Sequence, residues 1–428
     1  MGLQLCQLCE IAYFVTDKIP LENVLLTDYV TTDSLLPNKE GRCIAQNLPP
    51  QKCVLTHYKC GDVLVANIRP YLKKIWFADR EGGASADVLV FRAKSGHSQE
   101  FLYASLLQDS FYDYVMKGKK GSKMPRGDKD QIMRYSIPKL SLAEESCIGN
   151  MILSFCTKIN VNRRINDNLE AMAKQLYDYW FVQFDFPNEE GKPYKSSGGA
   201  MVWNEKLKRE IPQGWSVSNV KSLIEPIERG ISYSSDDLLD PFATPMINLA
   251  CFSKAGDYRL GEMKFFSGKV SNDKLISPMD MLIACTDMTQ GADIIGRPIL
   301  ASDEYDQYTF STDLALITPK GKFKMYLYYT LRTPFYHKYI RPFASGTTVK
   351  HLNLIGVENY GLPVPPIEIQ SKFEDLITPI KEKQSKNLNE INALTKQRDE
   401  LLPLLMNGQA SVNYHLSEFT SVFCQAVQ

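Results

Sequence analysis

The chain has 428 residues, which is enough for two or three domains that each bury a core. Lys plus Arg and Asp plus Glu both number 49, so the net charge is zero and a strongly basic chain is excluded. Any contact with nucleic acid must therefore come from local basic patches. No apolar run reaches the roughly 18–20 residues of a membrane-spanning helix, and Met1–Val15 lacks the features of a signal peptide.

The cysteines are scattered without a pairing framework, which is typical of reduced thiols, so we expect a cytoplasmic protein. Cys6 and Cys9 have CxxC spacing, but no second pair of ligands follows at similar spacing. A zinc site needs such a second pair. We therefore expect no metal in this chain.

The first predicted domain covers residues 1–140. It contains short β-type runs such as Val63–Val65 and Val88–Phe91, separated by Gly, Pro, Asn and Asp, and a helical pattern at Gln99–Val115. This mixture predicts an α+β fold with mainly antiparallel or mixed strands.

A long helix is predicted to follow at residues 141–185, because apolar residues recur at spacings of three and four from Ile148 onward. Residues 186–210 contain Pro, Gly and Ser without a helical or strand period, and we predict a linker there. A second α+β domain is predicted at residues 211–365, with a helix at Met325–Arg341, and a second long helix at 366–408. The tail at 409–428 is unpatterned and receives no role.

The chain repeats itself at a long period. A shift of 225 residues aligns Gly121 with Gly346 and Pro138 with Pro363; a shift of 218 aligns Asp62–Ala66 with Asp280–Ala284; a shift of 226 aligns Ala86–Leu89 with Thr312–Ala315. Loop insertions produce such small changes of shift. The sequence therefore predicts an internal repeat of two similar domains, each followed by a long helix.

The two helices carry matching heptad-like apolar seams, with Asn162 and Asn387 at equivalent places. A polar residue in such a seam lowers stability but fixes the register. A helix of about 35 residues is about 50 Å long, which is longer than one such domain needs. We predict an antiparallel coiled coil that holds the two domains at its opposite ends. The alternative is that each helix packs only on its own domain.

Signatures of catalysis are missing from the sequence. There is no phosphate-binding loop, no HExxH and no GxSxG motif, and Asn47–Pro50 has the wrong order for an amino-methyltransferase motif. We therefore predict no catalytic residue and no enzyme activity in this chain.

A glycine-broken basic loop in the first domain is a candidate for binding DNA phosphates, because backbone amides and lysines can approach a phosphate together. Its cations are Lys117, Lys119, Lys120, Lys123 and Arg126. The equivalent place in the second copy is Ser345–His351, again polar, small and basic, and the helix before it ends with Arg341. The alternative is a solvated surface loop.

A second candidate loop follows the strand at Val63. Its polar residues are Asn67, Arg69, Tyr71, Lys73 and Lys74. The counterpart Cys285–Gly291 is polar without basic charge, as suits two domains that read different sequences. The alternative is that Arg69-Pro70 forms a structural turn in which Arg69 pairs with an acid.

The chain resembles the specificity subunits of type I restriction-modification systems over about Ile19 to Val412. The motifs that carry the resemblance are Gly61–Lys74, Ala86–Phe91, Phe181–Asn188, Gly199–Trp203, Ile211–Trp215, Pro363–Glu368 with Gln370, and Arg398–Gly408. Their combination in order is specific, although each motif alone is weak. One departure is Ser141–Glu145, which stands where the second copy has Pro366–Gln370.

The resemblance implies two target-recognition domains that each read one half of a bipartite DNA target, and two helices that set the gap between the halves. It also implies partners: methyltransferase (modification) subunits, usually two, and restriction subunits. S-adenosylmethionine, ATP and Mg belong to those partners, so no cofactor is expected in this chain. The assembly methylates adenine or cleaves unmodified DNA.

The resemblance and the loop chemistry together suggest base-reading residues in the second domain, to be placed in the major groove. These are Thr286, Thr289, Gln290, Arg297, Thr347, Thr348, Lys350 and His351. Two other functions stay open: an interaction scaffold with a coiled coil and two ligand-binding heads that do not bind DNA, and a fragment of an enzyme that methylates in cis. The missing donor-binding motif argues against the second.

Overall fold

The computed structural model describes residues 4–51, 53–121, 123–238, 243–253, 257–259 and 262–411. The chain forms two compact units: unit 1 comprises Met1–Val161 with Ala393–Gln428, and unit 2 comprises Asn162–Asn392. The boundary between the units falls inside both long helices, so each unit holds part of each helix. None of the helices in the described part of the chain is long and apolar enough to cross a membrane.

Unit 1 is built on two four-stranded sheets. The central sheet has the order β2 (Ala12–Phe14), β9 (Val88–Ala93), β6 (Val63–Ala66), β7 (Ile75–Phe77), and all its pairs are antiparallel. The second sheet has the order β3 (Lys18–Pro20), β5 (Val54–Tyr58), β8 (Gly82–Ala84), β4 (Tyr29–Val30), with β4 and β8 parallel. The remaining elements of unit 1 are β1 (Leu5–Gln7) paired with β10 (Ser136–Pro138), α1 (Leu8–Ile11), α2 (Gln99–Leu107), α3 (Asp109–Lys117), α4 (Lys129–Met133), η1 (Leu21–Asn23), η2 (Leu26–Asp28) and η3 (Pro70–Leu72).

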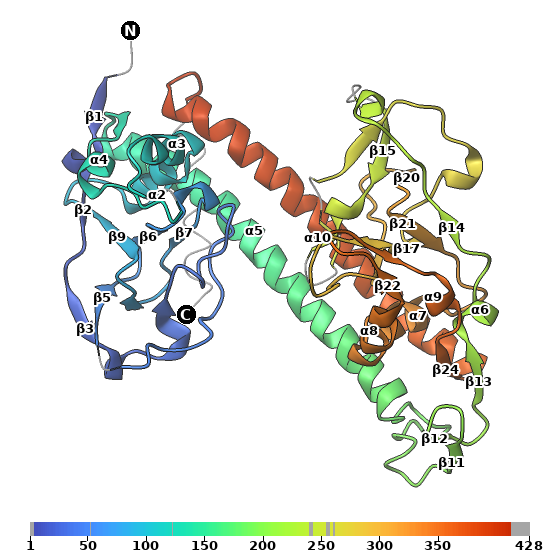
Figure 1. Cartoon of the computed structure of the whole chain (residues 1–428). Coiled ribbons are helices and arrows are strands. Elements are labelled where there is room, and N and C mark those ends of the chain that lie inside the picture. Colours follow the sequence, from blue (N-terminus) through green and yellow to red (C-terminus); the bar gives the residue numbers. More distant parts are fainter. Residues whose placement is uncertain are drawn as a thin grey trace. The chain divides into compact units, whose positions relative to one another are not determined.

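The central strands of unit 1 are buried on both faces. Val63 and Val65 of β6 pack in the same cluster as α2, whereas Leu64 and Ala66 pack with Tyr58 and Trp76 on the other face. Successive side chains of a strand point to opposite faces, so a strand between two layers must be apolar throughout. This explains the uninterrupted apolar runs in the sequence, and Figure 1 shows α2 beside β6 and β9.

Unit 2 contains the same frame. Its central sheet has the order β14 (Glu228–Arg229), β21 (Leu314–Ile317), β17 (Met281–Ala284), β19 (Pro298–Leu300). Three further groups of strands are β16 (Lys264–Phe266), β15 (Thr244–Ile247) and β20 (Thr309–Phe310); β13 (Ser216–Asn219) and β24 (Gly361–Val364); and β18 (Thr286–Asp287), β23 (Lys350–Leu352) and β22 (Ala344–Ser345). Its short helices are α6 (Val220–Leu223), α7 (Lys324–Thr330), α8 (Pro334–Ile340), α9 (Ile355–Glu358), η5 (Ser235–Leu238), η6 (Leu249–Cys251), η7 (Asn272–Lys274) and η8 (Arg341–Phe343).

The strand pairs of the two units match in register. Val63 of β6 pairs with Phe91 of β9, and Met281 of β17 pairs with Ile317 of β21. The numbers of the first residues differ by 218 and those of the second by 226, which are the shifts found in the sequence. The parallel pair β4–β8 recurs as β15–β20, and β1–β10 recurs as β13–β24. Each unit is therefore one copy of the same mixed α/β frame.

The helices expected at Gln99–Val115 and Met325–Arg341 are each two helices, so the prediction of single helices was wrong. In unit 2, Thr333 is extended and Pro334 opens α8. A residue before proline disfavours the helical region, while proline suits the first helical position. In unit 1, Gln108 has ψ 142° and separates α2 from α3 at the equivalent place.

The expectation of an irregular linker at residues 186–210 was wrong in part. β11 (Met201–Asn204) pairs with β12 (Arg209–Pro212) in an antiparallel hairpin, with Met201 opposite Pro212. The strands contain Val202, Trp203 and Ile211, which favour extended structure. Lys208 closes the turn with φ 52°.

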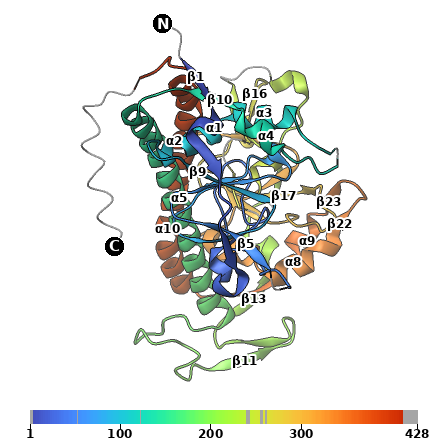
Figure 2. The same cartoon turned by 90° about the vertical axis from the view of Figure 1, so that its left-hand side faces the viewer.

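The two long helices are α5 (Leu142–Tyr177), which continues into a π-helical turn η4 (Asp178–Val182), and α10 (Ile367–Met406). They run antiparallel within each unit: Arg398 lies 4.0 Å from the Cys156 sulfur in unit 1, and Asn166 bonds Gln384 in unit 2. Figure 2 shows their ribbons side by side. Asn387 is 1% exposed, as expected for a polar seam residue, but it faces Asn166, one turn beyond the expected Asn162.

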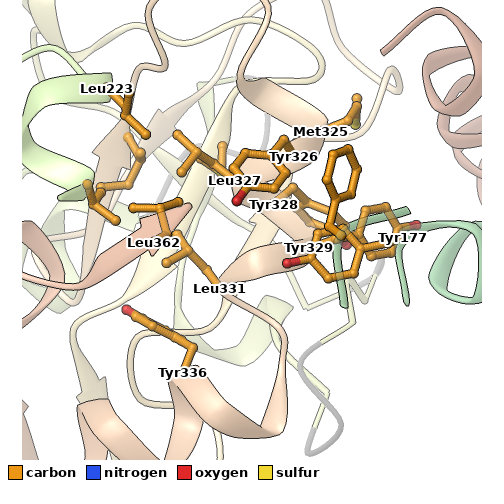
Figure 3. Close-up of a cluster of buried hydrophobic side chains, with 14 of the residues drawn as sticks. Tyr177, Leu223, Met325, Tyr326, Leu327, Tyr328, Tyr329, Leu331, Tyr336 and Leu362 are labelled. Atoms are coloured by element: carbon orange, nitrogen blue, oxygen red, sulfur yellow. The ribbon is translucent and has the colours of Figure 1, made fainter. Parts of the chain in front are cut away.

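Each unit buries parts of both long helices in its own core. In unit 1, Ile152 of α5 and Leu402 of α10 join the cluster that contains α2. In unit 2, Tyr177 and Phe373 join an aromatic cluster with Tyr326 and Tyr329, and Figure 3 shows Tyr177 against these rings. The helices therefore pack on each other and on the globular frames together.

Candidate nucleic-acid interface

The basic loop of unit 1 is a short hairpin that follows α3. Lys120 and Arg126 exchange two backbone hydrogen bonds of 2.9 and 3.0 Å. Gly121 turns the chain with φ +86°. Arg126 also bridges to Ile68, so the hairpin lies beside the second candidate loop. The structure thus brings together two segments that the sequence separates by about 50 residues.

The cations of this hairpin are exposed but not all are unneutralised. Lys117, Lys119 and Lys123 project into solvent. Lys120 lies 2.6 Å from an Asp128 carboxylate oxygen, and Arg126 lies 3.1 Å from Asp87. The hydrogen bond from Lys120 to Asp128 raises the pKa of Lys120 and lowers that of Asp128. Exposed ion pairs contribute little free energy, so a phosphate can replace these carboxylates.

In the second loop of unit 1, Arg69 and Tyr71 are the exposed members. Arg69 adopts a left-handed conformation (φ 52°) and opens η3 with Pro70, so it does form a turn. Its backbone N–H donates to the carbonyl of Pro125 in the basic hairpin at 2.8 Å. Tyr71 is 50% exposed. Both side chains are therefore held at the edge of the basic hairpin.

The other three residues of that loop make internal contacts. Lys73 lies 2.9 Å from Asp109, which also binds Lys39 at 2.8 Å. Although burial opposes the effect, hydrogen bonds from Lys39 and Lys73 hold the pKa of Asp109 below its usual value. The Lys74 ammonium donates to the carbonyl of Thr32, and Asn67 Oδ1 is buried beside Gly127. These contacts support the loop rather than present charge to solvent.

Unit 2 carries the same arrangement with different side chains. Ser345 of β22 pairs with His351 of β23, which also pairs with Thr286 of β18. These pairings repeat the bridges of Lys120 and Ile68 to Arg126 in unit 1. Thr347, Thr348 and His351 are exposed, whereas Lys350 is half-buried with its ammonium 3.5 Å from the Gly346 carbonyl.

The turn after β18 is shaped by buried polar groups. The Thr286 hydroxyl donates to Asp313 at 3.0 Å and is 2% exposed, so this threonine supports the loop in the structure. The buried Asp287 accepts the N–H groups of Thr289 at 2.6 Å and Ile294 at 2.8 Å. Thr289 Oγ1 accepts the N–H of Asp293. Gln290 is exposed at the tip of this turn.

Arg297 and Arg341 lie apart from the hairpin tip, in an open cleft of about 660 Å³. Besides two prolines, the cleft is lined by Lys174, Arg332, His337 and Lys338. Sequence reasoning missed these four residues. Lys338 and Arg341 share one helical face, which was a weak signal, but Lys174 and Arg332 come from other elements and only the fold joins them.

Among the described residues, no group of three or more His, Cys, Asp or Glu side chains is placed to hold a metal ion. Cys6 is buried, and the Cys9 sulfur lies 3.6 Å from the amide oxygen of Gln7.

Comparison with known proteins identifies the family. Residues 212–396 match the family described as "Type I restriction modification DNA specificity domain". The MjaIX specificity subunit of a type I restriction enzyme of Methanocaldococcus jannaschii is 26% identical over 74% of this chain and 71% of its own length. The HindI specificity subunit of Haemophilus influenzae is 22% identical over 89% of this chain and 94% of its own length.

A crystal structure of a type I restriction-modification S subunit from M. genitalium has the same fold. Its TM-score is 0.58 at 13% identity, over 95% of this chain and 96% of that one. The matched frame includes the sheets and both long helices described above. The chain therefore belongs to the family of type I restriction-modification specificity subunits, with the family's DNA specificity domain at residues 212–396.

Proposed function

We propose that this chain is the sequence-specific DNA-binding subunit of a type I restriction-modification complex, and that it recognises a bipartite target. The observation that carries the proposal is the repeated hairpin: Lys120–Arg126 and Ser345–His351 stand at the same place on the same frame. The frame is shared, whereas the side chains at the hairpins differ. A duplicated scaffold with divergent loops suits two readers of two different half-sites.

The chemistry of each hairpin fits a DNA groove. A two-stranded ribbon can enter the major groove, where hydroxyl, amide and arginine groups distinguish base edges. In unit 2, Thr347, Thr348 and His351 offer such groups at an exposed tip. In unit 1, Lys119 and Lys123 offer ammonium groups for phosphates, and Arg69 and Arg126 offer guanidinium groups. Lysine contacts to phosphates supply affinity, while contacts to base edges supply specificity.

The proposal assigns the chemistry to partner subunits. Methyltransferase subunits, two per complex, methylate adenine, and restriction subunits cleave unmodified DNA. S-adenosylmethionine, ATP and Mg are bound by those partners, and this chain is not itself an enzyme. The antiparallel helices α5 and α10 act as the spacer between the two half-sites. The Asn166–Asn387 hydrogen bond supports this role because it fixes their register. The complex acts in the cytoplasm.

The test is selection of target DNA by the reconstituted complex. The full chain is co-purified with its methyltransferase subunit and incubated with a random duplex library. We expect enrichment of one split motif. A Thr347→Ala/Thr348→Ala variant should lose preference in one half of the motif only, whereas Thr56→Ala, in a strand of unit 1, should leave both halves unchanged.

Enrichment of no split motif by the wild-type complex would overturn the proposal. If the chain still bound its partner but bound no duplex at low salt, the alternative of an interaction scaffold with heads that do not bind DNA would replace it.

A further inference from the structure

The open cleft of unit 2 concentrates positive charge from four separate parts of the chain. Lys174 comes from α5, Arg297 from the turn before β19, Arg332 from the junction of α7 and α8, and Lys338 and Arg341 from α8 and η8. His337 completes the polar lining. Five permanent cations around about 660 Å³ repel one another, so such a cluster favours an anionic ligand.

The acids near this cleft neutralise only one side of it. Arg332 bonds Asp257 and lies 3.8 Å from Glu170. Lys174, Lys338 and Arg341 form no ion pair with a residue that the structure describes. Burial lowers the pKa of Arg297, and the neighbouring Arg332 lowers it further. The net local charge is therefore positive.

The matching place in unit 1 shows that the frame does not require this charge. With the shift of 225 residues, Arg332 corresponds to Leu107, His337 to Tyr112, Lys338 to Asp113, Arg341 to Met116, and Lys174 to Asp399. There, Lys39 is neutralised by Asp109 at 2.8 Å and by Asp399 at 3.6 Å. The basic cleft is thus a property of the second copy alone.

The cleft is continuous with both loops that present polar groups in unit 2. Arg341 begins η8, which leads directly into β22 and its hairpin. The Nε2 atom of His337 lies 3.0 Å from the carbonyl of Ala292, in the turn that follows β18. A duplex held by the hairpin and this turn would therefore extend its sugar-phosphate backbone toward the cleft.

We infer that this cleft binds backbone phosphates of the target duplex, with Lys174, Lys338 and Arg341 as phosphate ligands. The inference rests on the proposed function and adds a binding site that lies outside the recognition loops. Such contacts position the duplex and carry no sequence information. The cleft should therefore add affinity and salt dependence to one half-site without changing which bases are read.

The test compares two double variants in the full chain with its methyltransferase subunit. Lys174→Gln/Lys338→Gln removes two cleft cations, and Lys383→Gln/Lys386→Gln removes two exposed lysines of α10 outside the cleft. For the cleft variant we expect the slope of log affinity against log salt to fall by about 1–2, and affinity to weaken on the order of tenfold. The ratio of target to scrambled affinity should stay unchanged, and the control should behave like wild type.

The source of the phosphate is identified by modified DNA. A target duplex with neutral methylphosphonates placed along the second half-site should contain positions where wild type and the cleft variant bind equally. Inorganic phosphate and ATP, tested separately by their effect on the melting temperature, should stabilise wild type no more than the cleft variant.

Several results would overturn the inference while leaving the proposed function standing. One is a cleft variant whose salt slope equals that of the control. Another is a cleft variant with normal DNA binding but weaker association with the methyltransferase subunit, which would assign the cleft to a protein partner. A third is loss of stabilisation by ATP with an unchanged DNA slope. Failure of wild type to bind any specific duplex would instead remove the proposed function itself.

Discussion

The side-chain amide of Asn387 donates a hydrogen bond of 2.8 Å to Oδ1 of Asn166 on the facing helix. Asn387 is almost fully buried, and Gln384 donates to the Asn166 carbonyl at 2.9 Å just beside it. A buried polar pair is favourable only while both partners are satisfied. This pair therefore stabilises one register of α5 against α10 over registers that would leave the amides unpaired.

We expect Asn387→Ala to destabilise the chain by about 1–3 kcal/mol, because it leaves Asn166 Oδ1 buried without this partner. The double variant Asn166→Ala/Asn387→Ala should cost less than the sum of the two single variants. Urea unfolding of all three proteins measures this coupling. Asn168→Ala, at an exposed position of α5, is the control and should change stability little. Strict additivity of the two seam variants would contradict the pairing.

The exposed lysines of the unit 1 hairpin should contribute to DNA affinity without selecting bases. We expect Lys119→Ala/Lys123→Ala to reduce the salt slope of binding by about 1–2. Lys120→Ala should have a smaller effect, because its ammonium is already paired with Asp128. Equilibrium binding to target and scrambled duplexes across a salt series measures both effects. Lys59→Ala is a matched exposed control in the same unit, and equal slopes for all variants would place the hairpin outside the interface.

The hairpin of unit 2 depends on a glycine. Gly346 has φ +118°, and a Cβ at this position would lie 2.0 Å from the carbonyl oxygen of Val349. Gly121 of unit 1 also has a positive φ, but a Cβ there would lie 3.4 Å from its nearest neighbour, the carbonyl oxygen of Met124. Gly346→Ala must therefore move backbone atoms, whereas Gly121→Ala meets mainly the conformational cost of about 1–2 kcal/mol.

We expect Gly346→Ala to weaken specific DNA binding more than Gly121→Ala, with little change in the unfolding of the unit 2 core. Binding to the selected target together with near-ultraviolet circular dichroism tests this. If Gly346→Ala unfolded the core as well, the effect on DNA binding could not be assigned to the hairpin. In that case hydrogen exchange of the hairpin amides in Gly121→Ala and wild type would test the same conformational argument in unit 1.

Glu170 should make stability depend on pH. Burial raises the pKa of its carboxyl, but the charges of Lys381 and Arg332 outweigh burial and the net pKa lies below the usual value. A lowered pKa in the folded state stabilises the chain above the unfolded pKa, and that contribution is lost as pH falls through the folded pKa. We therefore expect the stability advantage of wild type over Glu170→Gln to be largest near pH 7 and to shrink progressively below about pH 4.5.

Glu374 provides a control of opposite sign on the same helix pair. Burial raises the pKa of its carboxyl, although it accepts a 2.9 Å hydrogen bond from the backbone N–H of Met325. Its protonation in the folded state should favour folding as pH falls, so Glu374→Gln should compare best with wild type at neutral pH. Urea unfolding from pH 7 to pH 3 measures both. Parallel pH profiles for the two variants would contradict these assignments.

The sequence by itself determined the duplication and the frame. Apolar runs such as Val63–Ala66 and Met281–Ala284 are long because both faces of these strands are buried, and this local requirement is visible in composition. The strand registers then reproduced the sequence shifts. Heptad spacing likewise located α5 and α10, because helical periodicity is a short-range property.

The tertiary structure decided which polar groups act together. Lys73 and Lys74 looked like Arg69 in the sequence, yet contacts with Asp109 and Thr32 occupy them, while Arg69 faces the hairpin. The seam partner of Asn387 was one turn from the residue expected by equivalence, since the facing helix runs in the opposite direction. The cleft that joins Lys174 to Arg341 depends on contacts between residues distant in the chain, and no local pattern encodes such contacts.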